Sequence, residues 1–221
     1  MTSVSGGGNY VSDASIMEWL AKQQDRIYGD LRDSIHSSEA RAQFANELND
    51  IKAGLHAANR DPNHNFNNVD QQLQNFMQKY GSDPEFSDLC QGMQGIADDV
   101  HVNHVAQLLA QQGTQAIGDF VVSSARDGMD EATRTKIVQI AQLAITSGSN
   151  GAPHPQVYDD NKLKEWDDSI SGKLDVAGKN DQLTMIHIQQ LKATIDQGSQ
   201  FGSQFIASGD KTSSSIINNI A

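Results

Sequence analysis

The chain has 221 residues, with 16 Lys and Arg against 28 Asp and Glu, and a formal net charge of −12. Nucleic-acid binding depends on clustered Lys and Arg, so this acidic balance argues against a nucleic acid as a partner. Only 20% of the residues are charged, so most of the polar surface comes from Gln, Asn, Ser and Thr, and no apolar run of about 18 residues predicts a membrane span.

Residues 1–12 form a small, mostly polar segment without Lys or Arg. They contain no apolar core of a cleaved signal peptide, and they bury too little apolar surface to offset their ordering entropy. We therefore expect a disordered leader. The one cysteine, Cys90, excludes an intrachain disulfide and is expected to be a small buried residue.

Residues 13–58 carry two stretches of helical periodicity. The first places apolar residues at spacings of four and seven, at Ile16, Leu20, Ile27, Leu31 and Ile35. The second is a heptad seam of Phe44, Leu48, Ile51, Leu55 and Ala58. Projected backwards, the second seam falls on Arg41, Ser37, Ser34 and Asp30. The two stretches cannot share one apolar register, which predicts a kink or a helical hairpin near residue 37.

Further helices are predicted over 69–147. Residues 59–68 hold five Asn and a Pro, which is typical of a loop. Asp83 and Pro84 suit the start of a helix, and Asp130 suits the N-cap of another, because its side chain can accept a hydrogen bond from a free backbone N–H.

Residues 148–158 are rich in Pro and Gly and predict a linker before C-terminal helices over 159–221. The last segment has a heptad seam that includes Gly198 and Gly202, and such glycines weaken an isolated helix, so it needs a partner helix. Strict period-two alternation is almost absent. The sequence therefore predicts an all-α fold of long amphipathic helices, forming a helical bundle or coiled coil with a long C-terminal helix.

The sequence contains one weak candidate for a metal site. His101 and His104 share a helical face, with Asp98 and Asp99 one turn earlier, and this spacing could hold Zn²⁺ or Ni²⁺. The simpler interpretation is two ordinary surface or interface groups. The sequence contains no His-Glu-x-x-His, Cys-x-x-Cys, Gly-x-Ser-x-Gly or phosphate-loop motif. We expect no cofactor, no metal and no enzymatic activity, and hence a binding or assembly protein.

Three C-terminal segments resemble a known family. They are Asp160–Trp166, the Gln-rich Asp181–Leu191, and the terminal Ser-Ser-Ile-Ile-Asn-Asn-Ile220. Together they are similar to the C-terminal part of type III secretion needle-tip proteins, which are hydrophilic translocators, and the end also resembles needle and extracellular filament subunits. The leader and the pair of helical stretches over 13–58 are similar to the family's N-terminal export signal and hairpin. The larger tip proteins carry a mixed α/β insertion for which 148–157 leave no room, so the filament role stays open.

The resemblance implies a secreted, virulence-associated assembly subunit, exported by a Sec-independent route to the bacterial cell surface. It would self-associate, contact needle subunits and hydrophobic translocators, and be held by a dedicated chaperone. The expected assembly interface on the last helix is Ile188, Leu191, Ile195, Phe205, Ile216, Ile217 and Ile220. For Ile216, Ile217 and Ile220, packing within the chain against the N-terminal helices is the alternative. A competing hypothesis is a cytoplasmic helical adaptor or secretion chaperone that binds a partner helix.

Overall fold

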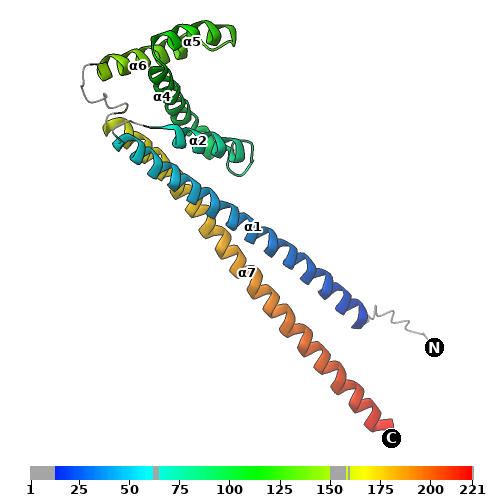
Figure 1. Ribbon diagram of the computed structural model, residues 1–221. Coiled ribbons are helices and arrows are strands. Elements are labelled where there is room, and N and C mark those ends of the chain that lie inside the picture. Colours follow the sequence, from blue (N-terminus) through cyan, green and yellow to red (C-terminus); the bar gives the residue numbers. More distant parts are fainter. Residues whose placement is uncertain (1–12, 62–64, 150–157, 159, 221) are drawn as a thin grey trace, which may run out of the picture. The chain divides into compact units, whose positions relative to one another are not determined.

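The computed structural model describes residues 13–61, 65–149, 158 and 160–220, and for 13–14, 147–149, 160, 209–210 and 212–220 it describes the backbone alone. Within these ranges the secondary structure is α-helical and no strand occurs (Figure 1). The predicted all-α fold with a long C-terminal helix is confirmed, since α7 spans Asp160–Ile220. The predicted leader 1–12 and most of the predicted linker lie outside the described residues.

Two compact units make up the chain. Residues 1–42 and 179–221 belong to the first, and residues 43–178 to the second. Helices α1 and α7 each contribute residues to both.

Helix α1 spans Asp13–Arg60 without interruption, so the predicted hairpin near residue 37 is wrong. No proline or glycine occurs between residues 30 and 53 to stop the helix. Three of the four polar residues that seemed to break the seam, Ser34, Ser37 and Arg41, are half-buried. The seam therefore continues through residue 37, but with polar side chains in place of apolar ones.

Two polar side chains of this part of α1, Ser38 and Arg41, have partners on α7, whereas Ser34 Oγ donates to the backbone oxygen of Asp30 within α1. Ser38 Oγ donates a hydrogen bond to Asp181 Oδ1 over 2.5 Å. Arg41 Nη1 donates to the backbone oxygen of Asn180 over 3.0 Å and also to Thr184 Oγ1. Because their hydrogen bonds are satisfied, polar groups at this seam do not carry the cost of unpaired burial.

The first unit is an antiparallel pair of helices, formed by the blue part of α1 and the orange part of α7 in Figure 1. A β-carbon at Gly198 would lie 3.6 Å from Nε2 of Gln24, so Gly198 faces α1. The α1 seam consists of Ile16, Leu20, Ile27 and Leu31, all half-buried. Ile35, which the sequence pattern placed on the same face, is exposed, because Ser34 occupies the seam position there.

The second unit begins with the heptad seam predicted for the C-terminal part of α1. Phe44, Leu48, Ile51, Leu55 and Ala58 are all buried, as predicted. Phe44 lies among three rings, contributed by α2 (Asn67–Tyr80) and by the residue before α3 (Ser87–Gln91), with centroids 4.8 to 5.1 Å away: Phe76, Tyr80 and Phe86. Polar contacts also join α1 to α7 within this unit, where His56 Nε2 lies 2.9 Å from both carboxylate oxygens of Asp167.

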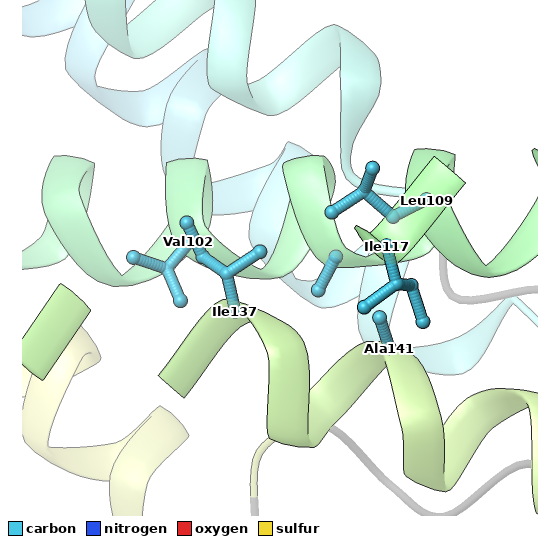
Figure 2. Close-up of a cluster of buried hydrophobic side chains, with 6 residues drawn as sticks. Val102, Leu109, Ile117, Ile137 and Ala141 are labelled. Atoms are coloured by element: carbon cyan, nitrogen blue, oxygen red, sulfur yellow. The ribbon is translucent and has the colours of Figure 1, made fainter. Parts of the chain in front are cut away.

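A further core in the second unit lies between α4 (Gln94–Gln112), α5 (Thr114–Arg126) and α6 (Glu131–Ser149). Its buried members are Val102, Ala106, Leu109, Ile117, Ile137 and Ala141. Figure 2 shows Val102 next to Ile137, and Ile117 between Leu109 and Ala141. Gly113, at φ 93°, separates α4 from α5 in a backbone conformation that favours glycine. At the start of α6, the Thr133 N–H donates to Asp130 Oδ1 over 2.8 Å, which confirms the predicted N-cap.

Candidate functional site

The two histidines singled out from the sequence meet a carboxylate that the sequence did not indicate. His101 and His104 both lie on α4, and both direct Nδ1 to Oδ2 of Asp70 on α2. The distances are 3.0 Å from His101 and 2.6 Å from His104. Each Nδ1–H donates, because a carboxylate only accepts. The cluster thus joins α2 to α4 through one carboxylate oxygen.

Asp70 is the buried centre of this cluster, with its side chain only 4% exposed. Gln74 Nε2 donates to the other carboxylate oxygen over 3.0 Å. Burial alone would raise the pKa of Asp70, but the hydrogen bonds from His104, His101 and Gln74 outweigh it and lower the pKa below its ordinary value. The carboxylate is therefore held ionised inside the second unit.

The predicted neighbours of the histidines, Asp98 and Asp99, are engaged elsewhere. Asp98 accepts from Gln94 Nε2 over 2.8 Å. The Asp99 carboxylate lies 2.7 Å from Nζ of Lys136 and 3.5 Å from Nζ of Lys162. Among the described residues, no group of three or more His, Cys, Asp or Glu has a geometry that could hold a metal ion. The histidines act here as hydrogen-bond donors between two helices.

Sequence reasoning missed Tyr158, which fell inside the predicted linker. Its ring lies between Phe66 and Trp166, with centroids 5.4 and 4.3 Å away. Its hydroxyl donates to the backbone oxygen of Asp99 over 2.7 Å and accepts from Asn103 Nδ2. Burial raises the pKa of Tyr158 far above its ordinary value, so this hydroxyl stays protonated and keeps donating. The available sign that Tyr158 is buried was its place as an aromatic residue among Pro, Gly and Asn, shortly before Trp166.

The expected assembly interface on α7 divides into two parts. Ile188 is buried, and Leu191, Ile195 and Phe205 are half-buried. These four share the heptad face of Asp181, Thr184 and Gly198, which contact Ser38, Arg41 and Gln24 of α1, so they lie toward α1 within the chain. The side chains of Ile216, Ile217 and Ile220 lie outside the described residues.

The first unit also carries large apolar side chains away from its seam. They are Met17, Trp19, Tyr28 and Ile35 on α1, with Leu183, Met185, Ile186, Phe201 and Ile206 on α7. By sequence, residues 1–42 and 179–221 contain seven Lys and Arg against nine Asp and Glu, whereas residues 43–178 contain nine against nineteen. Nine of the fourteen exposed large apolar side chains that the structure describes thus belong to the nearly neutral unit, where electrostatic repulsion between copies is weakest.

Fold and geometry together define an all-α chain with an antiparallel two-helix unit, rich in exposed apolar side chains, and a second unit with a packed helical core. No family model, curated protein or solved structure matches the chain. Among the described helices, none combines the length and apolar character needed to cross a membrane.

Proposed function

We propose that this chain is a secreted, non-enzymatic assembly subunit that self-associates through its two-helix unit. One observation carries the proposal. No side chain from residue 15 to 42 is buried, and from 179 to 208 Ile188 alone is buried. Helices gain most of their stability in proteins from packing an apolar face, and here that face is only half covered. Association with further helices supplies the missing burial.

The proposed setting is the tip or the filament of a type III secretion needle at the bacterial cell surface. There the subunit contacts needle subunits and supports the hydrophobic, pore-forming translocators, and a dedicated chaperone holds it before export. The supporting observation is that all three C-terminal segments with family resemblance fall on the single helix α7. An uncharged leader before α1 also suits export by a Sec-independent route.

Export is tested by expressing the full chain in a needle-forming bacterium with a functional or an inactive export ATPase. The expected result is protein in the culture supernatant only with the functional ATPase, with its N-terminal residues retained. A periplasmic protein exported by Sec and a cytoplasmic enzyme serve as controls for leakage of the periplasm and for lysis. Retention of the chain in the cytoplasm in both strains contradicts the proposal and favours the adaptor or chaperone hypothesis.

Self-association is tested separately, by sedimentation of the purified full chain over a concentration series. An oligomer that dissociates on dilution is the expected result. If the chain is monomeric at all concentrations and forms a complex only when a partner protein is added, the result supports an adaptor or chaperone instead.

A further inference from the structure

Helix α1 carries a second heptad series that its pairing with α7 leaves uncovered. The seam facing α7 includes the heptad series Leu20, Ile27, Ser34 and Arg41, all half-buried. One position later, about 100° around the helix, follow Ala21, Tyr28, Ile35 and Ala42. All four are exposed, Tyr28 to 52% and Ile35 to 38%. Such a regular apolar series is the pattern by which helices recognise each other.

The spacing within this series is self-complementary. In an antiparallel pairing of two copies centred on Tyr28, the small Ala21 of one copy meets the larger Ile35 of the other. Tyr28 then meets Tyr28 of the second copy on the two-fold axis. A small residue opposite a large one fills space evenly, and a two-fold axis uses the same patch on both copies.

Charges beside the series complement the same register. Asp25 and Arg32 lie one turn after Ala21 and Tyr28, on the edge of the series away from α7, and both are exposed. In the pairing centred on Tyr28, Asp25 of one copy lies opposite residue 31 of the other, one residue from Arg32. The two-fold axis produces this pairing of Asp25 with Arg32 twice. Glu18 is 2.7 Å from Lys22 within its own helix, so its charge is offset locally.

We propose that the face of α1 formed by Ala21, Tyr28, Ile35 and Ala42 binds a second copy of this chain in an antiparallel, two-fold symmetric dimer. This inference rests on the proposed self-association and names its contact surface and geometry. The near neutrality of the unit permits two copies to approach, because most of the excess acidic charge belongs to residues 43–178.

Disulfide trapping of the full chain tests the geometry. The double variant Ala21→Cys with Ile35→Cys should form a covalent dimer under mild oxidation. Either single variant should not, because two equivalent positions are then about 20 Å apart along the pair, well beyond the roughly 7 Å that a disulfide allows between Cα atoms. Native Cys90 is buried and does not compete. Efficient trapping of both single variants would instead indicate a parallel pair and overturn the proposal.

Sedimentation of substituted full chains tests the face. Tyr28→Ser should raise the dimer dissociation constant at least tenfold, roughly as expected for an aromatic residue at the centre of an interface. The matched control is Trp19→Ser. Trp19 is 60% exposed on the same helix, but it lies on the other side of the seam from Tyr28. Circular dichroism checks that helicity is retained. A dissociation constant raised by Trp19→Ser and unchanged by Tyr28→Ser would overturn the proposal.

Charge reversal tests the register. Asp25→Arg or Arg32→Asp alone should weaken the dimer about tenfold, and the combination of the two should restore it, since each reversal converts two weak attractions to repulsions. If the chain self-associates, but the cysteine pair forms no covalent dimer and the combined charge reversal does not restore binding, this dimer is overturned and the proposed function is not. A chain that stays monomeric at all concentrations would overturn both.

Discussion

His104 Nδ1 lies 2.6 Å from Oδ2 of Asp70, and this hydrogen bond connects α4 to α2 around a buried carboxylate. His101 shares the same oxygen, and Gln74 occupies the other. A buried charge with three donors is stable, but it becomes costly once a donor is lost, because the remaining groups stay desolvated. The cluster therefore couples the second unit's stability to the ionisation of Asp70.

Acid should weaken the second unit through Asp70. Its pKa is lower in the folded chain than the ordinary value of 3.8, so the folded state favours the carboxylate. This stabilisation is fully present above about pH 4 and is lost as the pH falls through the folded pKa. We expect Asp70→Asn to cost about 1–3 kcal/mol of unfolding free energy at pH 7 and to show a shallower loss of stability below pH 4.

Urea unfolding of the wild type and of the variant, at pH 7 and at pH 3, measures both effects. Asp98→Asn is the matched control, because Asp98 is exposed on α4 and accepts a hydrogen bond from Gln94 one turn earlier in the same helix. Its unfolding free energy should stay within about 0.5 kcal/mol of the wild type. Equal stability of Asp70→Asn and the wild type at pH 7 would show that the cluster is not coupled to folding.

Ile137→Ala should destabilise the core between α4 and α6. Ile137 is fully buried and lies next to Val102 in Figure 2. Truncation leaves a cavity in addition to the lost burial, which costs about 2–5 kcal/mol. Thermal or urea unfolding measures the loss. Leu143→Ala, at a residue 60% exposed on the same helix, should change the unfolding free energy by less than about 0.5 kcal/mol, and similar values for both variants would contradict this core.

The sequence predicted helices best where apolar residues carried the pattern. Phe44 to Ala58 were placed on the correct face because burial in a packed unit selects apolar side chains at heptad spacing. The same reasoning wrongly predicted a hairpin near residue 37 of α1. There Ser38 and Arg41 hold α1 to α7 by hydrogen bonds, and hydrophobic periodicity does not detect a contact made by polar side chains.

The histidine cluster shows a second limit of the sequence. The spacing of His101 and His104 was visible, but their partner Asp70 is 31 and 34 residues away on another helix. Asp98 and Asp99 were expected because they are close in sequence, yet their carboxylates bond to Gln94 and to lysines of α6 and α7. Which of several acids meets a histidine depends on helix packing, and a local pattern does not specify it.

Arg41→Ala should loosen the antiparallel pair locally. The substitution removes the hydrogen bonds to Asn180 and Thr184 and leaves those groups in a half-covered seam. We expect a cost of about 1–2 kcal/mol, seen as faster amide hydrogen exchange in residues 30–42 and 179–190. Arg26→Ala, at an exposed position on α1, is the control and should leave exchange unchanged. Unchanged exchange in the Arg41 variant would mean that the polar seam contributes nothing to the pairing.

The two parts of the expected α7 interface should respond differently to substitution. Ile188 is buried within the described pair, so Ile188→Asp should lower the stability of the monomer itself and speed exchange in α1. The triple variant Ile216→Asp, Ile217→Asp and Ile220→Asp should abolish assembly onto the needle, and should leave both monomer helicity and the dimer formed through α1 unchanged. Circular dichroism and sedimentation separate the two effects, and secretion of other needle substrates reports on function. Normal secretion by the triple variant would remove the chain end from the proposed interface and leave the seam facing α1 as a purely internal contact.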